Sequence, residues 1–274
     1  MRLSCRDNSF PLLSLDGALH VIADLGLEGV DISISPRHAQ LDPAAVLEDP
    51  SGQAANVSRL VRAAGLLVAD VFVLTGFGPS VLSVNARTAN ERQQARRQFD
   101  ALLQFAVQAG APGMTVLPGE PWNDDPETGL AVAAEELAWR AQQASAEGLG
   151  LSFEPHAISN VRTPDSVLAL LDRSAGVGLT LDYSHFVSLG ITEEAVDPLL
   201  PHARHFQARQ ASPGHLQATA RTGVINFPRI IHALIAHGYV GWFGIEYTWN
   251  SWMDEVDTIA QTALLRDVAR TVLS

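Results

Sequence analysis

The chain of 274 residues is 47% hydrophobic and carries a formal net charge of −12, with 30 acidic residues against 18 basic ones. An acidic balance argues against nucleic-acid binding, because proteins that bind nucleic acids normally present a basic face to the phosphates. No apolar run approaches the ~20 residues that cross a bilayer, and the N-terminus lacks the apolar stretch of a signal peptide, so we expect a soluble cytoplasmic protein without a membrane partner.

Strand-like and helix-like segments alternate from one end of the chain to the other. Short apolar segments predict strands, and the amphipathic stretches between them predict helices. Several of the helices are followed by glycine, which accepts the left-handed turn that closes a helix. In chain order the clearest elements are strand 2–6, helix 14–27, strand 29–34, strand 67–75, helix 90–110, strand 113–118, helix 131–148, strand 149–154, strand 177–182, strand 203–208, helix 227–238, strand 242–247 and a final helix 254–273.

Eight strands that alternate with helices predict an α/β fold, a parallel (β/α)8 TIM barrel. The strands are apolar enough for burial on both faces, as in a parallel sheet. The count of eight favours a closed barrel over a doubly wound sheet, and no G-x-G-x-x-G motif follows the first strand. No linker or second domain is evident, so residues 1–274 are expected to form one domain.

Two long connections, 76–88 and 119–129, follow the third and fourth strands and should rise over the catalytic face of a barrel. Flat aromatic side chains there would suit a sugar, whose C–H surfaces they cover. Hydrophobic capping of the barrel is the alternative. The candidates for such an aromatic wall are Phe77, Trp122, Trp249 and Trp252.

Four of the later strands end in side chains that can bind a hard metal ion. Three carboxylates meeting on one face of a barrel would repel each other, and a bound divalent cation is the simplest source of compensating charge. The spacings of 28, 25 and 39 residues between the candidates each correspond to about one βα unit. These candidates are Glu154, Asp182, Gln207 and Glu246.

Because all four donors are oxygen atoms, they favour one Mn²⁺ or Mg²⁺ over Zn²⁺. Gln207 would bind through its neutral carbonyl oxygen. Its alternatives are a plain hydrogen bond in the barrel mouth, or replacement as ligand by His205 on the same strand face. The alternative for Glu154 is a structural salt bridge or an ordinary acid at the end of a strand. His185 follows Asp182 by three residues and would reach a substrate atom, unless it is a packed or helix-capping histidine.

Composition narrows the chemistry further. All 18 basic residues are arginine. The absence of lysine excludes Schiff-base aldolase chemistry and a pyridoxal-phosphate aldimine, which both need an amine nucleophile, and also excludes a Walker A loop. Cys5 is the single cysteine, so no intrachain disulfide and no thiolate metal site can form.

Four sequence segments carry a family resemblance: FEPH (153–156), LDYSHF (181–186), HFQARQ (205–210) and, most specifically, TGVINFPRIIHALIAHGYVGWFGIEY (222–247). Through them the C-terminal 125 residues or so resemble the sugar-phosphate isomerase/epimerase superfamily of xylose-isomerase-like TIM barrels. Ketose 3-epimerases and inosose-pathway enzymes belong to this group. The earlier part of the chain matches only in its rhythm of strands and helices.

The resemblance implies a small sugar-like substrate and a single divalent metal, held by Glu154, Asp182, Gln207 and Glu246. In epimerases of this group two glutamates lie on opposite faces of the substrate carbon. One removes a proton next to a carbonyl and the other returns it, while the metal stabilises the enediolate. Glu154 and Glu246 would be this catalytic pair, and His185 and Arg209 would bind substrate oxygens.

The chain departs from the family pattern where Gln207 replaces the usual histidine and Gln210 replaces the usual acid. The first change is compatible with a metal site, and the second leaves open which hydroxyls are recognised. His156, beside Glu154, would bind substrate or act as an extra acid or base.

Alternatives to an isomerase therefore stay open. The first alternative is a lyase, a dehydratase or decarboxylase of a keto-sugar or keto-acid. The second is a non-catalytic sugar-binding barrel. The histidine-rich zinc site of the endonuclease relatives is disfavoured. The identity of the substrate and its phosphorylation are not specified by the sequence, nor is the oligomeric state, for which a homo-oligomer is one expectation.

Overall fold

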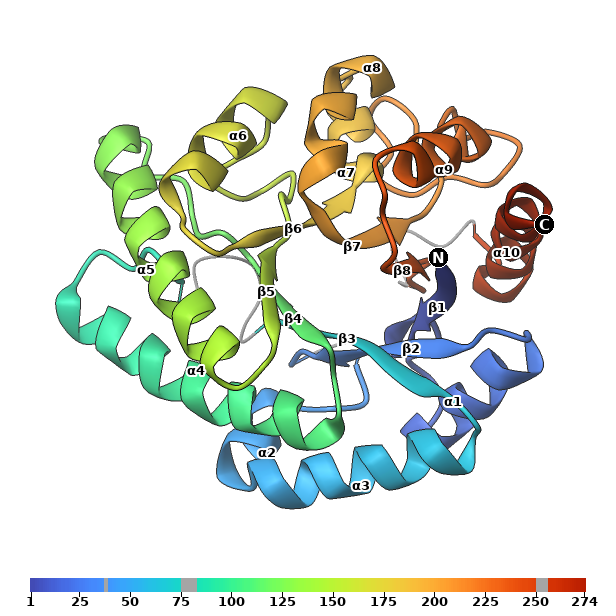
Figure 1. Cartoon of the computed structure of the whole chain (residues 1–274), viewed down its shortest axis with the longest axis horizontal. Coiled ribbons are helices and arrows are strands. Elements are labelled where there is room, and N and C mark those ends of the chain that lie inside the picture. The colour runs from blue at the N-terminus through green and yellow to red at the C-terminus, as the bar shows by residue number, and fades with distance from the viewer. Residues whose placement is uncertain (37–38, 75–82, 250–255) are drawn as a thin grey trace.

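Eight parallel strands form a closed barrel in the computed structural model, which describes residues 1–36, 39–74, 83–249 and 256–274. The strands pair in sequence order, and β1 pairs with β8 to close the ring (Figure 1). The predicted (β/α)8 barrel is confirmed. The strands are β1 (Arg2–Arg6), β2 (Gly29–Ile34), β3 (Leu67–Val73), β4 (Gly113–Val116), β5 (Gly150–Phe153), β6 (Gly178–Asp182), β7 (Ala203–Ala208) and β8 (Trp242–Ile245).

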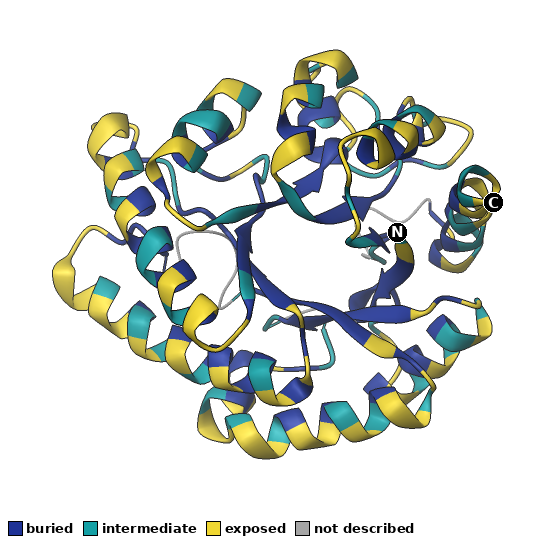
Figure 2. Cartoon of the chain, viewed as in Figure 1, coloured by how far each residue is buried: buried dark blue, intermediate teal, exposed yellow. Residues whose placement is uncertain are grey.

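Helices surround the barrel and turn their apolar sides to it, so that in Figure 2 buried residues line the inner side of the ring and exposed ones the outer side. None of the helices in the described part of the chain is long and apolar enough to cross a membrane. The helices are α1 (Leu15–Asp24), α2 (Pro43–Glu48), α3 (Pro50–Ala63), α4 (Ala89–Ala109), α5 (Pro126–Ala146), α6 (Pro164–Arg173), α7 (Tyr183–Ser188), α8 (Glu193–Val196), α9 (Phe227–Ala236) and α10 (Thr258–Leu273), with short 3₁₀ turns η1 (Asp7–Ser9) and η2 (Asp197–His202).

The helix α5 begins five residues earlier than the apolar pattern predicts. Asp125 caps it by accepting a hydrogen bond from the backbone N–H of Thr128, and Pro126 occupies the first turn, where no N–H is needed. The predicted long connection 119–129 is therefore shortened to 119–125.

Gly110 directly follows α4 and adopts the predicted left-handed conformation, with φ of 81°.

The interior of the barrel is polar, which corrects the expectation that the strands are apolar on both faces. Hydrogen bonds join strands that are not neighbours, so the side chains concerned point inward. Thr115 Oγ1 lies 2.6 Å from Thr180 Oγ1, and His205 Nε2 lies 2.8 Å from Asp31 Oδ2. Buried polar groups are tolerated when they bond each other in this way. The apolar core lies instead between the barrel and the helices.

Arg204, at the start of β7, extends this polar interior. Its guanidinium donates to Asp70 Oδ1 and Ser152 Oγ, both at 2.7 Å. A Cβ at Gly150 would lie 2.6 Å from Arg204 Cδ, and one at Gly113 would overlap the guanidinium. The glycines that open β4 and β5 thus make room for the arginine beneath the barrel layer that carries the candidate site.

Candidate active site

The C-terminal ends of four neighbouring strands bring the predicted acids together. Glu154 follows β5, Asp182 ends β6, Gln207 lies on β7 and Glu246 follows β8. One carboxylate oxygen from each of the three acids lies within 4.8 Å of the others. All four residues are at most 5% exposed, so the charges of the three acids interact with little screening by water.

Gln207 lies between the two glutamates. The end of its amide is 2.6 Å from Glu154 Oε1 and 2.7 Å from Glu246 Oε2. With the NH₂ group turned toward them, Gln207 donates a hydrogen bond to each carboxylate. With the carbonyl oxygen turned toward them, it completes a cluster of oxygen atoms that only a cation would stabilise. The same side chain thus suits the site with or without a metal ion.

Two buried arginines compensate part of the negative charge. Arg6, the last residue of β1, pairs through Nη1 with Glu246 Oε1. Arg209 Nη2 lies 3.0 Å from Asp182 Oδ2, and its Nη1 lies 3.4 Å from Glu246 Oε1. Three carboxylates and two guanidiniums leave one net negative charge among these residues. Arg209 was expected at the site, whereas Arg6 was not.

Arg209 and Asp182 are held rigidly through Ser184. The Ser184 hydroxyl donates to Asp182 Oδ2 at 2.7 Å and accepts from Arg209 Nε at 2.9 Å. The Ser184 backbone N–H donates to Asp182 Oδ1 at 2.8 Å, since Asp182 is the N-cap of α7. Both oxygens of Asp182 are thereby oriented before any ligand arrives.

Two histidines flank the acids on the same side. His185 Nε2 lies 3.9 Å from Glu154 Oε1 and 3.7 Å from Asp182 Oδ2, and the rings of His156 and His185 lie 4.1 Å apart. Burial, helped by Arg209 and Arg6, lowers the pKa of His156 to about 3, and burial and the neighbouring His156 lower the pKa of His185 well below its usual value. Both imidazoles are therefore neutral and able to accept a hydrogen bond.

Crowding of the acids raises their affinity for protons. Burial and repulsion from Glu246 and Asp182 raise the pKa of Glu154 well above its usual value. Burial also raises the pKa of Asp182, although Arg209 opposes the effect. A cation among these oxygens would act in the opposite direction and keep the acids ionised.

Two residues considered in the sequence take structural positions instead. His205 pairs with Asp31 in the barrel layer beneath Gln207, which disfavours it as a replacement ligand. Gln210, where the family resemblance implies an acid, donates to the backbone oxygen of Ile225 at 2.8 Å and accepts from its N–H at 3.0 Å. An ionised acid could not make the first of these bonds, so Gln210 fixes the loop before α9.

The predicted aromatic wall is only partly within the described residues. Trp122 is buried, packs beside Gly129 of α5 and carries the guanidinium of Arg87 4.6 Å above its ring. These contacts are those of hydrophobic capping. Trp249 is partly exposed two residues beyond Tyr247, which follows Glu246. Phe77 and Trp252 lie outside the described residues.

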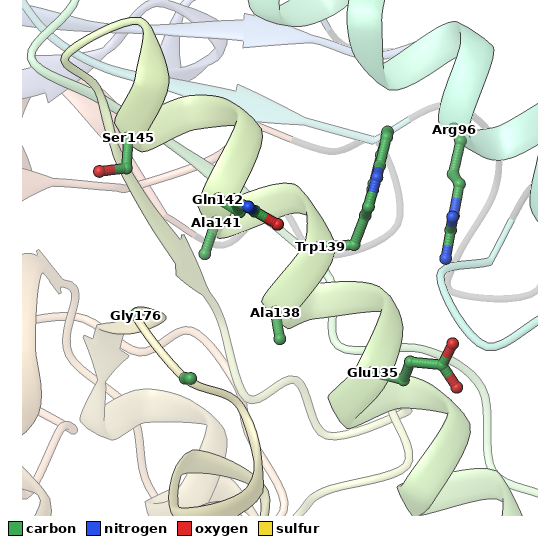
Figure 3. A pocket seen from close by; sticks show the side chains of 9 residues that line it. Arg96, Glu135, Ala138, Trp139, Ala141, Gln142, Ser145 and Gly176 are labelled. Carbon is green, nitrogen blue, oxygen red and sulfur yellow. The ribbon is translucent and has the colours of Figure 1, made fainter.

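A separate depression lies on the outside of the barrel (Figure 3). It has a volume of about 680 Å³ and is lined by residues of α4, α5 and the turn at Gly176, among them Arg96 and Trp139. None of the four strand-end residues lines it. The depression is therefore separate from the cluster of acids at the strand ends.

A TIM barrel with carboxylates, an amide and guanidiniums at the C-terminal ends of its strands has the architecture of a barrel enzyme, because catalytic residues of such barrels come from these ends. The family model described as xylose isomerase-like TIM barrel matches residues 19–268, and the chain belongs to this family. The resemblance found in the C-terminal part of the sequence is thereby confirmed for most of the chain. A comparison of the sequence with curated proteins gives no match.

Solved structures share the fold at low sequence identity. D-psicose 3-epimerase with D-tagatose from Clostridium cellulolyticum H10 aligns over 100% of both chains with a TM-score of 0.80 and 14% identity. A xylose isomerase-like TIM barrel protein from Mycobacterium smegmatis in complex with magnesium aligns over 100% of this chain and 98% of its own, with a TM-score of 0.73 and 16% identity. The probable 3-DHS dehydratase AsbF from Bacillus anthracis aligns over 97% and 99%, with a TM-score of 0.74 and 13% identity.

Proposed function

We propose that the protein is a divalent-metal-dependent isomerase or epimerase of a small keto-sugar or polyol-derived substrate. The proposal is carried by one observation: Glu154 and Glu246 approach the same amide of Gln207 from two strands, at 2.6 and 2.7 Å. Inversion or isomerisation next to a carbonyl needs one base to remove a proton and a second group to deliver it. Two carboxylates that converge on one position supply both.

The residues at the strand ends fit a divalent cation. Its ligands would be Glu154, Asp182, Gln207 and Glu246. This set of oxygen donors favours Mn²⁺ or Mg²⁺ over Zn²⁺. When bound, the cation would polarise the substrate carbonyl and stabilise the negative charge that develops on its oxygen. The similar protein from M. smegmatis was solved in complex with magnesium, which is compatible with this choice.

The side chains of the site divide the remaining work. One glutamate takes the proton from the carbon next to the carbonyl, and the other returns a proton to that carbon or to its neighbour. Arg209, oriented by Ser184, and the neutral His185 would donate to or accept from substrate oxygens. His156, whose ring lies 4.1 Å from the ring of His185, would complete this polar side of the site.

A lyase is the second candidate, and the pair of histidines is the observation that favours it. Glu154, His156 and His185 each place one atom within 4.8 Å of the others, which provides more than one proton carrier on the same side of the site. Loss of water after proton removal needs such a second carrier for the leaving hydroxyl. The fold is shared with a protein named as a probable dehydratase.

Proton exchange in D₂O tests the proposal. Protein loaded with Mn²⁺ and incubated with a panel of keto-sugars should incorporate deuterium next to the carbonyl and give a product of unchanged formula, whereas a lyase would give a product lighter by water or carbon dioxide. Glu154→Gln and Glu246→Gln should each abolish net conversion, with Glu147→Gln, an exposed residue at the end of α5, as the matched control. Wild-type conversion by either site variant would refute the role assigned to that residue.

A further inference from the structure

We infer that Arg6 selects a substrate that bears a carboxylate group. The inference concerns the substrate class of the site described above and rests on the function proposed for it. Arg6 was not among the residues expected at the site. Its role follows from how its guanidinium is fixed, from which of its nitrogen atoms are engaged, and from the charge it adds to the site.

Arg6 is held in one orientation at the end of β1. It is 4% exposed, its guanidinium carbon lies 4.0 Å from the centre of the Phe72 ring, and its Nε donates to Ser33 Oγ at 3.3 Å. Its Nη1 pairs with Glu246 Oε1. A guanidinium fixed on three sides loses little further freedom when it binds a ligand.

One end of this guanidinium has capacity for a ligand. Within the described part of the chain, no acceptor bonds Nη2 of Arg6, although the residue is buried. Arg209 differs, because its Nε, Nη1 and Nη2 bond Ser184, Glu246 and Asp182. Arg209 therefore offers a substrate only those N–H groups that these bonds leave over, whereas Nη2 of Arg6 can donate to a substrate oxygen. Two N–H groups of one guanidinium match the two oxygens of a carboxylate.

The charge balance indicates which ligand this is. Glu154, Asp182 and Glu246 carry three negative charges, and the two arginines carry two positive ones, so a divalent cation would leave the site with one net positive charge. A neutral ketose would leave that charge buried and uncompensated, whereas a carboxylate brings the sum to zero and a phosphate dianion overshoots it. Without Arg6 the same count would suit a neutral sugar.

Two further acids near Arg6, Asp31 and Asp7, are left out of this count of charges because each is bonded to other groups. Asp31 bonds His205 Nε2 at 2.8 Å in the layer beneath the site. Asp7 turns away to the backbone N–H groups of Ser33 and Asn8, at 3.0 and 2.7 Å, and burial raises its pKa to about 7. Arg6 hydrogen-bonds Ser33 and Glu246 and neither of these two acids, although its charge opposes the rise in the pKa of Asp7.

Unreactive matched ligands test the inference separately from turnover. Binding to the Mn²⁺-loaded protein is measured by calorimetry for D-gluconate against D-glucitol, and for D-glycerate against glycerol, pairs that differ in one carboxylate. We expect a carboxylate to bind at least about 100-fold more tightly than its neutral partner, and Arg6→Gln to remove most of that preference. Arg6→Lys should retain part of it, and Arg2→Gln, on the same strand but half-exposed, should retain all of it.

Four results would overturn the inference. Equal binding of the carboxylate and its neutral partner by the wild type would exclude carboxylate selection. A preference that persists unchanged in Arg6→Gln would assign the carboxylate to the metal or to Arg209, and equal weakening of both partners would show that Arg6 only positions Glu246. Tighter binding of glycerol 3-phosphate than of glycerate would assign a phosphate instead. Loss of keto-sugar turnover with the carboxylate preference intact would contradict the proposed reaction and leave the carboxylate site standing.

Discussion

Replacement of Gln207 by glutamate tests whether this side chain lies between two carboxylates. In Gln207→Glu a third acid would stand 2.6 and 2.7 Å from oxygens of Glu154 and Glu246. At an effective dielectric constant of about 20, each such pair repels by about 6 kcal/mol, or about 12 kcal/mol in all. Protonation of a glutamate at pH 7 costs only about 4 kcal/mol, so the metal-free variant should take up a proton rather than hold the charge.

The metal-free variant should therefore be less stable than the wild type by about 4 kcal/mol, which corresponds to a fall in Tm of roughly 10 °C. Saturating Mn²⁺ should recover most of this loss, because a cation ionises and binds the added acid. The assay is thermal unfolding at pH 7 in EDTA and in Mn²⁺.

Gln210→Glu provides the control for this experiment. Gln210 also loses a donor on substitution, since its Nε2 bonds the Ile225 oxygen, but it lies outside the cluster of acids. Its loss of stability should not respond to Mn²⁺. If Gln207→Glu in EDTA is as stable as the wild type, or if Mn²⁺ stabilises both variants equally, the placement of Gln207 at a cation site is refuted.

Three further predictions concern the metal preference, a buried acid and a buried ion pair. Gln207→His should keep proton exchange and bind Zn²⁺ more tightly relative to Mn²⁺ than the wild type does, because it adds a nitrogen donor; metal competition followed by elemental analysis measures this, and an unchanged ratio would argue against ligation at this position. Burial raises the pKa of Asp7 to about 7, above its unfolded value, so the wild type should lose stability as pH rises from about 4 to 7. In urea unfolding, Asp7→Asn should be more stable than the wild type at pH 8, by up to about 4 kcal/mol, but not at pH 4. An equal difference at both pH values would contradict the assignment. Glu136 lies 2.8 Å from Arg140, which is 2% exposed, so Glu136→Ala should lower the unfolding free energy by about 3–5 kcal/mol. Replacement of the exposed neighbour, Glu135→Ala, should change it by less than about 1 kcal/mol. Similar values for the two variants would show that Arg140 finds another partner.

The architecture was predictable from the sequence because the local signals agree with the global fold. β1, β2 and β7 have the bounds expected from their apolar segments, and several others end one or two residues earlier. The start of α5 was missed because capping by Asp125 outweighs the weakly apolar first turn. The polar barrel interior was missed because alternation within strands of four to seven residues is hidden by serine and threonine, which are compatible with either face.

The candidate site was predictable where polar residues end apolar strands. That pattern located Glu154, Asp182 and Glu246, which the structure brings within 4.8 Å. It was not applied to β1, whose last residue is Arg6, although the same reasoning holds there. The net charge of the chain does not indicate Arg6 either, because it does not distinguish a buried arginine at a strand end from the exposed arginines on the helices.

The capping role of Trp122 and the bonds of Gln210 could not be read from the sequence. Both depend on which loop lies above them: Gln210 bonds a residue 15 positions later, and Trp122 packs on the first turns of α5. Motif spacing places a residue at the barrel mouth but does not specify whether its side chain meets substrate or backbone. Tertiary contacts decide this.

A crystal structure of the protein soaked in Mn²⁺, with anomalous data collected at the manganese edge, tests the central claim most directly. We predict one anomalous peak about 2.2 Å from oxygen atoms of Glu154, Asp182, Gln207 and Glu246, with the carbonyl oxygen of Gln207 turned to the ion. Absence of the peak at saturating Mn²⁺, with the Gln207 NH₂ still bonding both glutamates, would contradict a metal site. A peak at His156 and His185 instead would contradict this set of ligands.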